Sequence, residues 1–201
     1  PDALDISDPL RPQRGRSADG RVLQAAYYAM IKLIDDQVGR ILTALDASGQ
    51  RDNTVVIFTS DHGEMLGDHG LIQKGCRFYE GLVRVPLIFS WPGHFAEGEC
   101  SDALVELLDK TPTIMELAGL EPPQRMQGRT LLPMLRGEAP LNHHRDSVRC
   151  EYYDALDEPD GSFATMYRDE QYKLVVYHGH YLGELYDLEE DPEEFENMWD
   201  E

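Results

Sequence analysis

The feature that most constrains this chain is a short apolar run that ends abruptly in polar residues. Residues 55–58 are Val-Val-Ile-Phe, and the next five residues are Thr-Ser-Asp-His-Gly. A continuous run of β-branched and aromatic residues predicts a strand buried on both faces of a parallel sheet. Open α/β sheets bind ligands at the carboxyl ends of such strands, so residues 59–63 are the expected place for a site.

Two of these residues carry side chains that bind metals. Asp61 offers a carboxylate oxygen and His62 an imidazole nitrogen, which together supply part of a divalent metal shell. Zinc takes about four ligands and calcium six to eight, so further ligands must come from elsewhere. Lys74 follows through a glycine-punctuated loop, and its ammonium would stand beside the metal as a point charge suited to a tetrahedral oxyanion. The glycines of this loop are Gly63, Gly67, Gly70 and Gly75.

Each of these residues also has a plain structural interpretation. An Asp-His pair after a strand is often a turn that caps a helix, and Lys74 by itself would be a solvated surface lysine. The order of features favours a site: an apolar strand, Asp-His-Gly, the glycine loop, a lysine, and then a second apolar strand at residues 85–89.

The same stretch resembles the C-terminal half of a sulfatase, a family of the alkaline phosphatase superfamily. The resemblance lies in residues 60–64, residues 67–70, Lys74, residues 79–81 and residues 84–88. It implies that Asp61 and His62 ligate a divalent metal, usually calcium, with Mg²⁺ or Mn²⁺ as alternatives. It also implies that Lys74 binds the sulfate and stabilises its charge, and that His69 could lie at the pocket.

The resemblance further implies a fold class and a division into domains. The fold would be α/β, with part of an alkaline phosphatase-like sheet and its flanking helices in residues 1–137. A small antiparallel α+β subdomain with a closing helix would follow in residues 138–201. Asp35 and Asp36, on the helix before the metal strand, are expected to form a solvated helix face, because neighbouring side chains on a helix diverge by about 100°.

The activity that the resemblance implies is hydrolysis of a small-molecule or carbohydrate sulfate ester. Its nucleophile is a formylglycine made in a C-x-P-x-R type motif, which we expect in an N-terminal half of the same protein. None of Cys76, Cys100 and Cys150 stands in such a motif, so this chain alone is expected to be inactive. Two alternatives remain open: a phosphonate monoester or phosphodiester hydrolase of the same superfamily, and a non-catalytic metal- or anion-binding fragment.

Composition excludes some partners. The formal net charge is -20, and ten of the 38 acidic residues lie in residues 184–201, which contain no Lys or Arg. Such a balance argues against a broad nucleic-acid or anionic-membrane face. No apolar stretch is long enough to span a membrane, and the first residue is Pro1, so we expect a processed, truncated or cloned piece.

Periodicity predicts the remaining elements. Apolar residues spaced three and four apart predict a helix over residues 23–45, capped by Ser17 or Asp19 and ended by Gly49. A second helix should start at a Thr111 cap with Pro112 in its first position, and end at Gly119. Strands are expected at residues 147–153, 162–168, 173–177 and 184–187. His178 and His180 are interpreted as surface histidines at a hairpin tip, with zinc ligation or a substrate-rim contact as alternatives.

Overall fold

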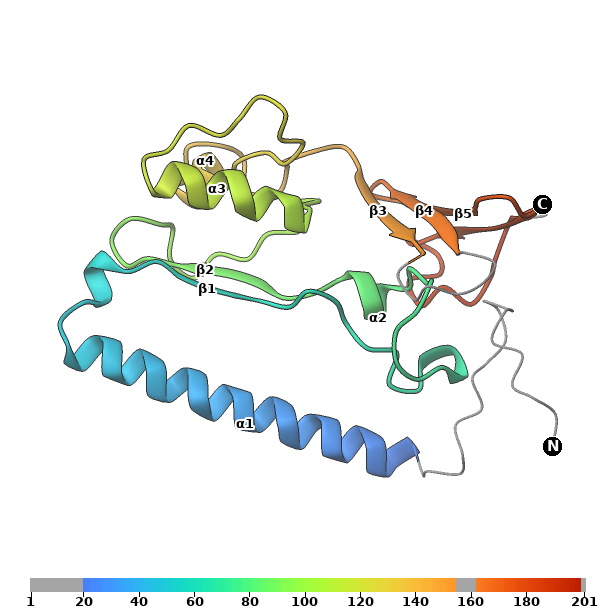
Figure 1. The fold of residues 1–201 in the computed structure, drawn as a ribbon, viewed down its shortest axis with the longest axis horizontal. Helices are drawn as coiled ribbons and strands as arrows, with labels where there is room; N and C mark the ends of the chain where they lie inside the picture. Colours follow the sequence, from blue (N-terminus) through green and yellow to red (C-terminus); the bar gives the residue numbers. More distant parts are fainter. Residues whose placement is uncertain (1–19, 155–161, 200–201) are drawn as a thin grey trace. The chain divides into compact units, whose positions relative to one another are not determined.

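The computed structural model describes residues 20–154 and 162–199 of the 201-residue chain. The chain divides into two compact units, Pro1–Pro92 and Gly93–Glu201, and each is described by itself. The first unit holds a long helix and two strands, and the second holds shorter helices and a four-stranded sheet (Figure 1).

The long helix α1 (Gly20–Ala47) confirms the helix that the spacing of apolar residues predicted. It ends close to Gly49, which has a φ of +68° and whose N–H donates to Asp46 O at 3.0 Å. A left-handed glycine is a common way to end a helix. The expected caps, Ser17 and Asp19, lie outside the described residues.

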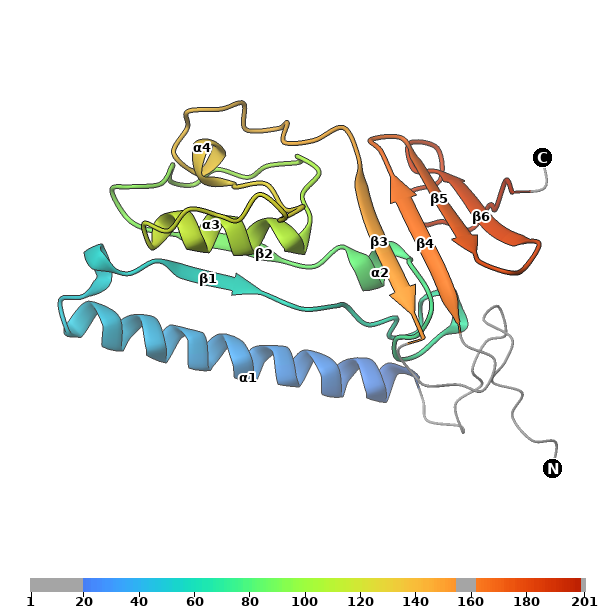
Figure 2. The ribbon, with the colours of Figure 1, turned by 45° about the horizontal axis from the view of Figure 1, so that its top comes forward.

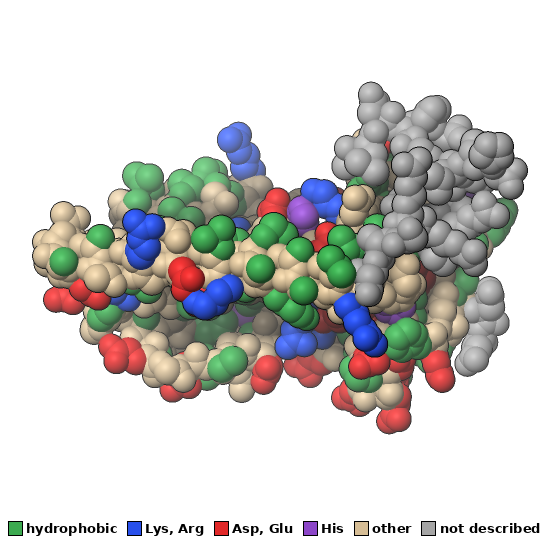
Figure 3. All heavy atoms as spheres, turned by 90° about the horizontal axis from the view of Figure 1, so that it is seen from below, with side chains coloured by type: hydrophobic (Ala, Val, Ile, Leu, Met, Phe, Trp, Pro, Cys, Tyr) green, Lys and Arg blue, Asp and Glu red, His purple; other side chains and the backbone are tan. Residues whose placement is uncertain are grey.

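Apolar side chains lie open along α1, which has no buried residue in the part of the chain that the structure describes (Figure 3). The exposed large apolar residues are Val22, Leu23, Tyr28, Met30, Ile31, Leu33, Ile34 and Ile41. Lys32 pairs with Asp36 one turn later, as solvated helix faces commonly do. None of the described helices combines the length and the apolar character needed to cross a membrane.

The strand predicted before the candidate site is formed, but it pairs antiparallel with its neighbour and not parallel as expected. Strand β1 (Val56–Thr59) pairs antiparallel with β2 (Leu87–Ser90), so the predicted parallel strand, buried on both faces, is wrong for this pair. Phe58 and its partner Ile88 are 37% and 55% exposed. A short apolar run does not distinguish the two kinds of pairing, because its direction depends on the neighbouring strand.

The core of the first unit lies in the connection between the two strands. This connection contains the short helices η2 (Asp68–Gly70) and α2 (Glu80–Val83). Met65, Leu71 and Leu82 are buried together there, and the partly buried Tyr79 and Val83 pack against them. Burial therefore stabilises the loop that follows β1 more than it stabilises the strand itself.

The second unit begins with three short helices, η3 (Leu107–Asp109), α3 (Lys110–Leu117) and α4 (Leu132–Leu135). Helix α3 starts two residues earlier than expected, with Asp109 rather than Thr111 at its N-cap position. Asp109 also closes a capping box with Glu106 at the start of η3, so the two helices run on from each other. The expected end near Gly119 is confirmed by a φ of +72°.

A buried carboxylate ties these helices together. Asp109 is fully buried, and its Oδ1 accepts hydrogen bonds from Arg129 N at 2.7 Å and from the Arg145 guanidinium. Its Oδ2 accepts from Glu106 N at 2.8 Å and lies 3.4 Å from His144 Nε2. A buried charge needs such partners, so this cluster holds the helical segment to the chain that leads into the sheet.

The sheet of the second unit confirms the four predicted strands. They pair antiparallel in sequence order (Figure 2). Ala164, Met166 and Val175 are buried on one face, together with the ion pair of Lys173 and Glu194, whose Nζ and Oε1 atoms lie 2.6 Å apart. The strands are β3 (Val148–Tyr153), β4 (Phe163–Arg168), β5 (Tyr172–Tyr177) and β6 (Leu182–Asp187).

The short closing helix expected after the last strand is not formed in residues 188–199. Polar groups of this segment bond to the outer edge of β6 instead. Leu185 N donates to Asn197 Oδ1 at 3.0 Å, Asn197 Nδ2 donates to Gly183 O at 3.1 Å, and Met198 N donates to Leu185 O at 2.8 Å. These bonds protect a strand edge that would otherwise be open.

The domain boundary expected near Gly137 falls inside the second unit. The change from helices to strands does occur around it, between Leu135 and Val148. A separate domain over residues 138–201 stays a prediction.

Candidate metal and anion site

The candidate site begins in a tight turn at the end of β1. The Ser60 hydroxyl donates to His62 O at 2.7 Å, and the backbone N–H of His62 donates to Asp61 Oδ1 at 3.0 Å. These short-range bonds hold the Asp61 and His62 side chains beside each other. Asp61 Oδ2 lies 3.8 Å from His62 Nε2.

The ring of His62 is oriented by its own chain. Nδ1 lies 2.7 Å from Gly63 O, and a carbonyl oxygen only accepts, so the proton of the ring is on Nδ1. Nε2 is then left with a lone pair, and Lys74 Nζ lies 2.7 Å from it. A backbone carbonyl that fixes one nitrogen so that the other can bind a cation is the usual arrangement of metal-binding histidines.

Asp61 is ionised at neutral pH. The pKa of its carboxyl is lowered, first because the His62 backbone N–H donates to it, and then because its own N–H and the neighbouring His62 and Lys74 side chains favour the anion. The side chain is 86% exposed in this chain. An open carboxylate beside an imidazole lone pair can accept a cation.

The loop after the turn brings Lys74 back to His62. Residues with positive φ angles let the chain reverse direction: Leu66 (+48°), Gly67 (+111°), His69 (+53°), Gly70 (+69°) and Gln73 (+68°). The backbone closes on itself through Gly67 N to Leu71 O at 2.7 Å and Met65 N to Gln73 O at 3.4 Å. The structure therefore brings together three residues that the sequence singled out, Asp61, His62 and Lys74.

The loop is held against α2 by a close backbone approach. Gly63 N donates to Leu82 O at 2.8 Å, and Glu64 N donates to Gly81 O at 3.1 Å. A Cβ atom at Gly63 would lie 1.9 Å from Gly81 O, which is far inside contact distance. Glycine is required at this position because the two backbones touch there.

His69, the expected pocket residue, packs against an aromatic neighbour. Its ring stacks on Tyr79 with centroids 4.0 Å apart and planes 15° from parallel. Such stacking accounts for the position of the ring. Contact of His69 with a substrate stays a prediction.

Glu64 is the residue at this site to which the sequence assigned no role. One of its carboxylate oxygens accepts a hydrogen bond from Leu66 N at 3.3 Å and a shorter one from Gln73 N. The signal in the sequence was weak: a carboxylate next to a glycine loop is more often solvated. Only the reversal of the chain brings Gln73 to it.

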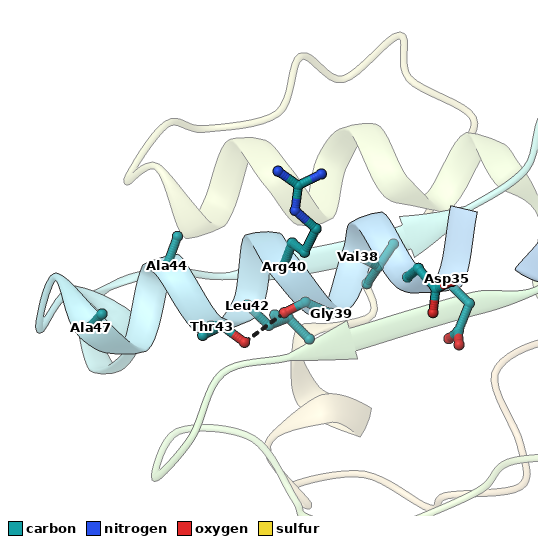
Figure 4. A pocket seen from close by; sticks show the side chains of 9 residues that line it. Asp35, Val38, Gly39, Arg40, Leu42, Thr43, Ala44 and Ala47 are labelled. Atoms are coloured by element: carbon teal, nitrogen blue, oxygen red, sulfur yellow. Dashed lines mark hydrogen bonds between the residues drawn. The ribbon is translucent and has the colours of Figure 1, made fainter. Parts of the chain in front are cut away.

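The other acidic candidates stay away from this cluster. Lys32 Nζ lies 3.7 Å from Asp35 Oδ2 and pairs with Asp36, and the two carboxylates are 75% and 55% exposed, which confirms a solvated helix face. Both line a hollow whose walls are all residues of α1 (Figure 4). The Thr43 hydroxyl at that hollow already donates to Gly39 O at 2.9 Å.

The histidines of the second unit fit the hairpin-tip interpretation. His178 and His180 are exposed in the turn after β5, and His178 Nε2 lies 2.8 Å from Thr165 Oγ1. Across residues 20–154 and 162–199, no group of three or more His, Cys, Asp or Glu side chains is placed to hold a metal ion.

The donor set at Asp61 and His62 fits one divalent cation. An oxygen and a nitrogen 3.8 Å apart can both reach the same ion at about 2.0–2.6 Å. The oriented lone pair of Nε2 faces an ammonium group, which shows that this side of the ring accepts positive charge. Hard and borderline cations such as Ca²⁺, Mg²⁺, Mn²⁺ and Zn²⁺ match these atoms.

Two proteins with similar sequences match most of the chain. The multifunctional alkaline phosphatase superfamily protein PehA of Trinickia caryophylli is 38% identical over 191 residues, which cover 89% of this chain and 36% of that protein. N-acetylglucosamine-6-O-sulfatase of Bacteroides thetaiotaomicron is 34% identical over 178 residues, which cover 86% of this chain and 31% of that protein.

Solved structures confirm the expected α/β fold class. The phosphonate monoester hydrolase of Agrobacterium radiobacter superposes with a TM-score of 0.77 at 36% identity, over 87% of this chain and 36% of that chain. A protein solved in complex with its substrate D-glucosamine-2-N,6-O-disulfate also superposes with a TM-score of 0.77, at 32% identity and with the same coverage. The chain spans about a third of the length of the relatives that it matches.

The family matches themselves span the whole site. Residues 11–120 match the family described as Sulfatase, and residues 67–201 match the family described as N-sulphoglucosamine sulphohydrolase, C-terminal. Each match covers more than half of the 201 residues, and the chain therefore belongs to the sulfatase family.

Proposed function

We propose that the complete protein hydrolyses sulfate esters, and that this chain supplies the part of its active site that holds a metal and the sulfate group. The observation that carries the proposal is the approach of Lys74 Nζ to within 2.7 Å of His62 Nε2, with the Asp61 carboxylate alongside. Membership of the sulfatase family supports the same reaction.

In this proposal Asp61 and His62 are two ligands of a divalent cation, with Ca²⁺ first and Mg²⁺ or Mn²⁺ as alternatives. When bound, the cation would supply positive charge to the non-bridging oxygens of the ester. The lowered pKa keeps Asp61 anionic, and the Gly63 carbonyl keeps the proton of His62 on Nδ1. Asp61 is thus ready to bind a cation without losing a proton first, and His62 presents Nε2 to the same cation.

Lys74 binds the sulfate and stabilises charge that develops on its oxygens. With a cation at His62, the ammonium would no longer share the Nε2 lone pair and could donate to the ester instead. Its side chain is exposed and reaches the site from the far end of the loop. A compact point charge of this kind is worth most where the oxygens become more negative in the transition state.

The nucleophile belongs to a part of the protein outside this sequence. A formylglycine needs a C-x-P-x-R type motif, and the 201 residues contain none. We propose that an N-terminal half supplies this residue together with the remaining metal ligands. Sulfated carbohydrates are the substrate class that we favour, since one structural relative was solved with a glucosamine disulfate as its substrate.

A second candidate is hydrolysis of phosphonate monoesters. It is favoured by the 36% identity to the phosphonate monoester hydrolase of Agrobacterium radiobacter. Phosphonate and sulfate esters present similar tetrahedral oxygens to Asp61, His62 and Lys74, so the same three residues serve both reactions.

The test is Lys74→Ala in the complete protein, assayed on an aryl sulfate and on an aryl phosphonate monoester with added Ca²⁺. We expect turnover of the preferred substrate to fall by about 10²–10³, because loss of one charged donor to the transition state typically costs that much. Lys110→Ala, which removes a lysine at the start of α3, is the matched control and should keep normal turnover.

The two assays also separate the candidates. A higher kcat/KM on the sulfate supports the sulfatase, whereas a higher value on the phosphonate supports the second candidate. Normal turnover by Lys74→Ala on both esters would remove the role of Lys74. A large fall in thermal stability without a change in kcat would make it a structural residue.

A further inference from the structure

The loop that carries Lys74 is closed by one carboxylate. Glu64 stands at the start of the loop, and one of its oxygens accepts hydrogen bonds from Leu66 N and from Gln73 N. Leu66 belongs to the outgoing part of the loop and Gln73 to its returning part. The same oxygen therefore joins two stretches of chain that run in opposite directions.

Gln73 needs such a partner. Its φ is +68°, a left-handed conformation that residues other than glycine rarely adopt. The side chains of Gln73 and Lys74 are exposed, so packing does not hold this short stretch in place. The hydrogen bond from Gln73 N to an ionised carboxylate does, because charge-assisted bonds are the strong ones.

The residue that follows Gln73 is Lys74, and the direction of its side chain depends on the backbone before it. In the observed conformation its Nζ reaches His62 Nε2 at 2.7 Å. If the backbone of Gln73 rotated to a negative φ, the side chain of Lys74 would move away from the His62 ring. We infer that Glu64 is a positioning residue, which holds Lys74 at the anion site through the backbone of Gln73; this inference rests on the proposed function.

The fold of the loop does not depend on this carboxylate alone. The Glu64 backbone N–H donates to Gly81 O at 3.1 Å, and Met65 N donates to Gln73 O at 3.4 Å. Met65 and Leu71 are also buried with Leu82 beneath the loop. Removing the carboxylate should therefore leave the loop folded and loosen the conformation of its returning end.

The first experiment compares Glu64→Ala, Glu64→Gln and the matched control Asp52→Ala in the complete protein. We expect Glu64→Ala to lower kcat by about 10–10², since misplacement of a charged group by about 1 Å costs up to that factor. It should also raise the inhibition constant of inorganic sulfate, which probes the Lys74 site directly. Glu64→Gln keeps an acceptor oxygen and should recover most of both losses, and Asp52→Ala removes an exposed carboxylate outside the loop and should behave as wild type.

The second experiment is a double-mutant cycle with Lys74→Ala. If Glu64 acts through Lys74, Glu64→Ala should add less than a twofold loss in the Lys74→Ala background, because there is no longer an ammonium to position. Gln73→Gly should restore part of the turnover of Glu64→Ala, since glycine adopts positive φ without strain. A purely structural role of Glu64 would give neither result.

The outcomes separate this inference from the proposed function. If Lys74→Ala reduces turnover and Glu64→Ala does not, or if the two losses multiply fully, the positioning role is wrong and the function stands. If Lys74→Ala itself leaves turnover and sulfate inhibition unchanged, the proposed role of Lys74 in binding sulfate is wrong, and the positioning role of Glu64 is wrong with it. Loss from Asp52→Ala equal to that from Glu64→Ala would show a general effect of lost charge and would also contradict the inference.

Discussion

The two ring nitrogens of His62 face different partners, and this difference decides what the residue can do. The Gly63 carbonyl accepts from Nδ1 at 2.7 Å, so Nε2 presents a lone pair toward Lys74 and Asp61. The sequence singled out His62 as a candidate ligand but could not predict its tautomer, because the carbonyl that selects the tautomer belongs to the folded turn. The role of His62 therefore depends on a hydrogen bond to its immediate neighbour in the chain.

His144 carries a prediction at the same scale. Its side chain is 11% exposed beside Asp109, and its pKa is lowered, first by burial. The attraction of Asp109 opposes this lowering, and the positive charges of Arg145 and Arg129 add to it. A histidine with a lowered pKa in the folded state binds its proton more readily when unfolded. The stability of the fold therefore falls as the pH drops below the ordinary histidine pKa of about 6.5.

The measurement is the thermal midpoint of the complete protein between pH 7.5 and pH 5, for wild type and His144→Gln. We expect the wild type to lose more stability across this range than the variant, with an additional slope of at most about 1.4 kcal/mol per pH unit for one proton. Parallel curves for the two proteins would show that His144 does not contribute, and a steeper fall in the variant would reverse the sign of the argument.

At the scale of elements, the loop between β1 and α2 is a small folded unit of its own. It has a buried centre of Met65, Leu71 and Leu82 and backbone bonds to α2. Helix α2 has only four residues, which is too short to be stable by itself, so the packing of the loop stabilises it. The loop and α2 thus form together, and Lys74 depends on both.

Gly63→Ala tests this dependence. The added methyl group would meet Gly81 O at 1.9 Å and Leu82 Cα at 3.1 Å, so the end of β1 and α2 must separate. We expect destabilisation of about 1–3 kcal/mol, as for other overpacked sites, which lowers the thermal midpoint of the complete protein by several degrees. Turnover should fall as well, because the Gly63 carbonyl that orients the His62 ring would move.

Gly75→Ala is the matched control in the same loop. A Cβ at Gly75 meets no atom within 4 Å, so this variant should keep its midpoint and turnover. Equal losses from the two glycines would mean that loop flexibility, and not the close backbone approach, matters at Gly63.

At the scale of the whole molecule, the chain leaves large apolar surfaces open. Helix α1 has no buried residue among those described, and Phe58 and Ile88 are exposed on the two-stranded sheet. Exposed apolar patches of this extent are typical of surfaces that another part of a protein covers. The chain also spans about a third of the length of its relatives.

We therefore predict that the 201-residue chain, expressed alone, associates and has no specific sulfatase activity. Sedimentation should show species larger than the 22.9 kDa monomer, because the open faces of α1 and of β1 and β2 will bind each other. Assays beside the complete protein on an aryl sulfate with Ca²⁺ should give no turnover from the chain.

A monodisperse monomer would contradict the first half of this prediction. Multiple metal-dependent turnovers from the chain, abolished by Cys76→Ser, would contradict the second half and would make Cys76 a nucleophile despite its lack of a C-x-P-x-R motif.

Local order in the sequence was enough to determine much of this protein. The spacing of apolar residues predicted α1 and the four strands β3 to β6. Helices and strands repeat about every 3.6 and 2 residues, so residues close together in the sequence show which of the two is formed. The ordered motifs in residues 60–64, 67–70, 79–81 and 84–88, together with Lys74, were enough to predict the sulfatase family. These features can be predicted from the sequence because each depends on residues that are close together in the chain.

Other features were decided only by the tertiary structure. The antiparallel pairing of β1 with β2, the bonding of Asn197 to β6 in place of a closing helix, and the bond from Gln73 to Glu64 all join groups that lie apart in the sequence. Such contacts depend on which distant segments of the chain pack together, and the local propensity of a segment does not determine its partner. For the same reason the sequence singled out Asp61, His62 and Lys74 as candidates, whereas only the fold placed the Glu64 carboxylate against the backbone of Gln73.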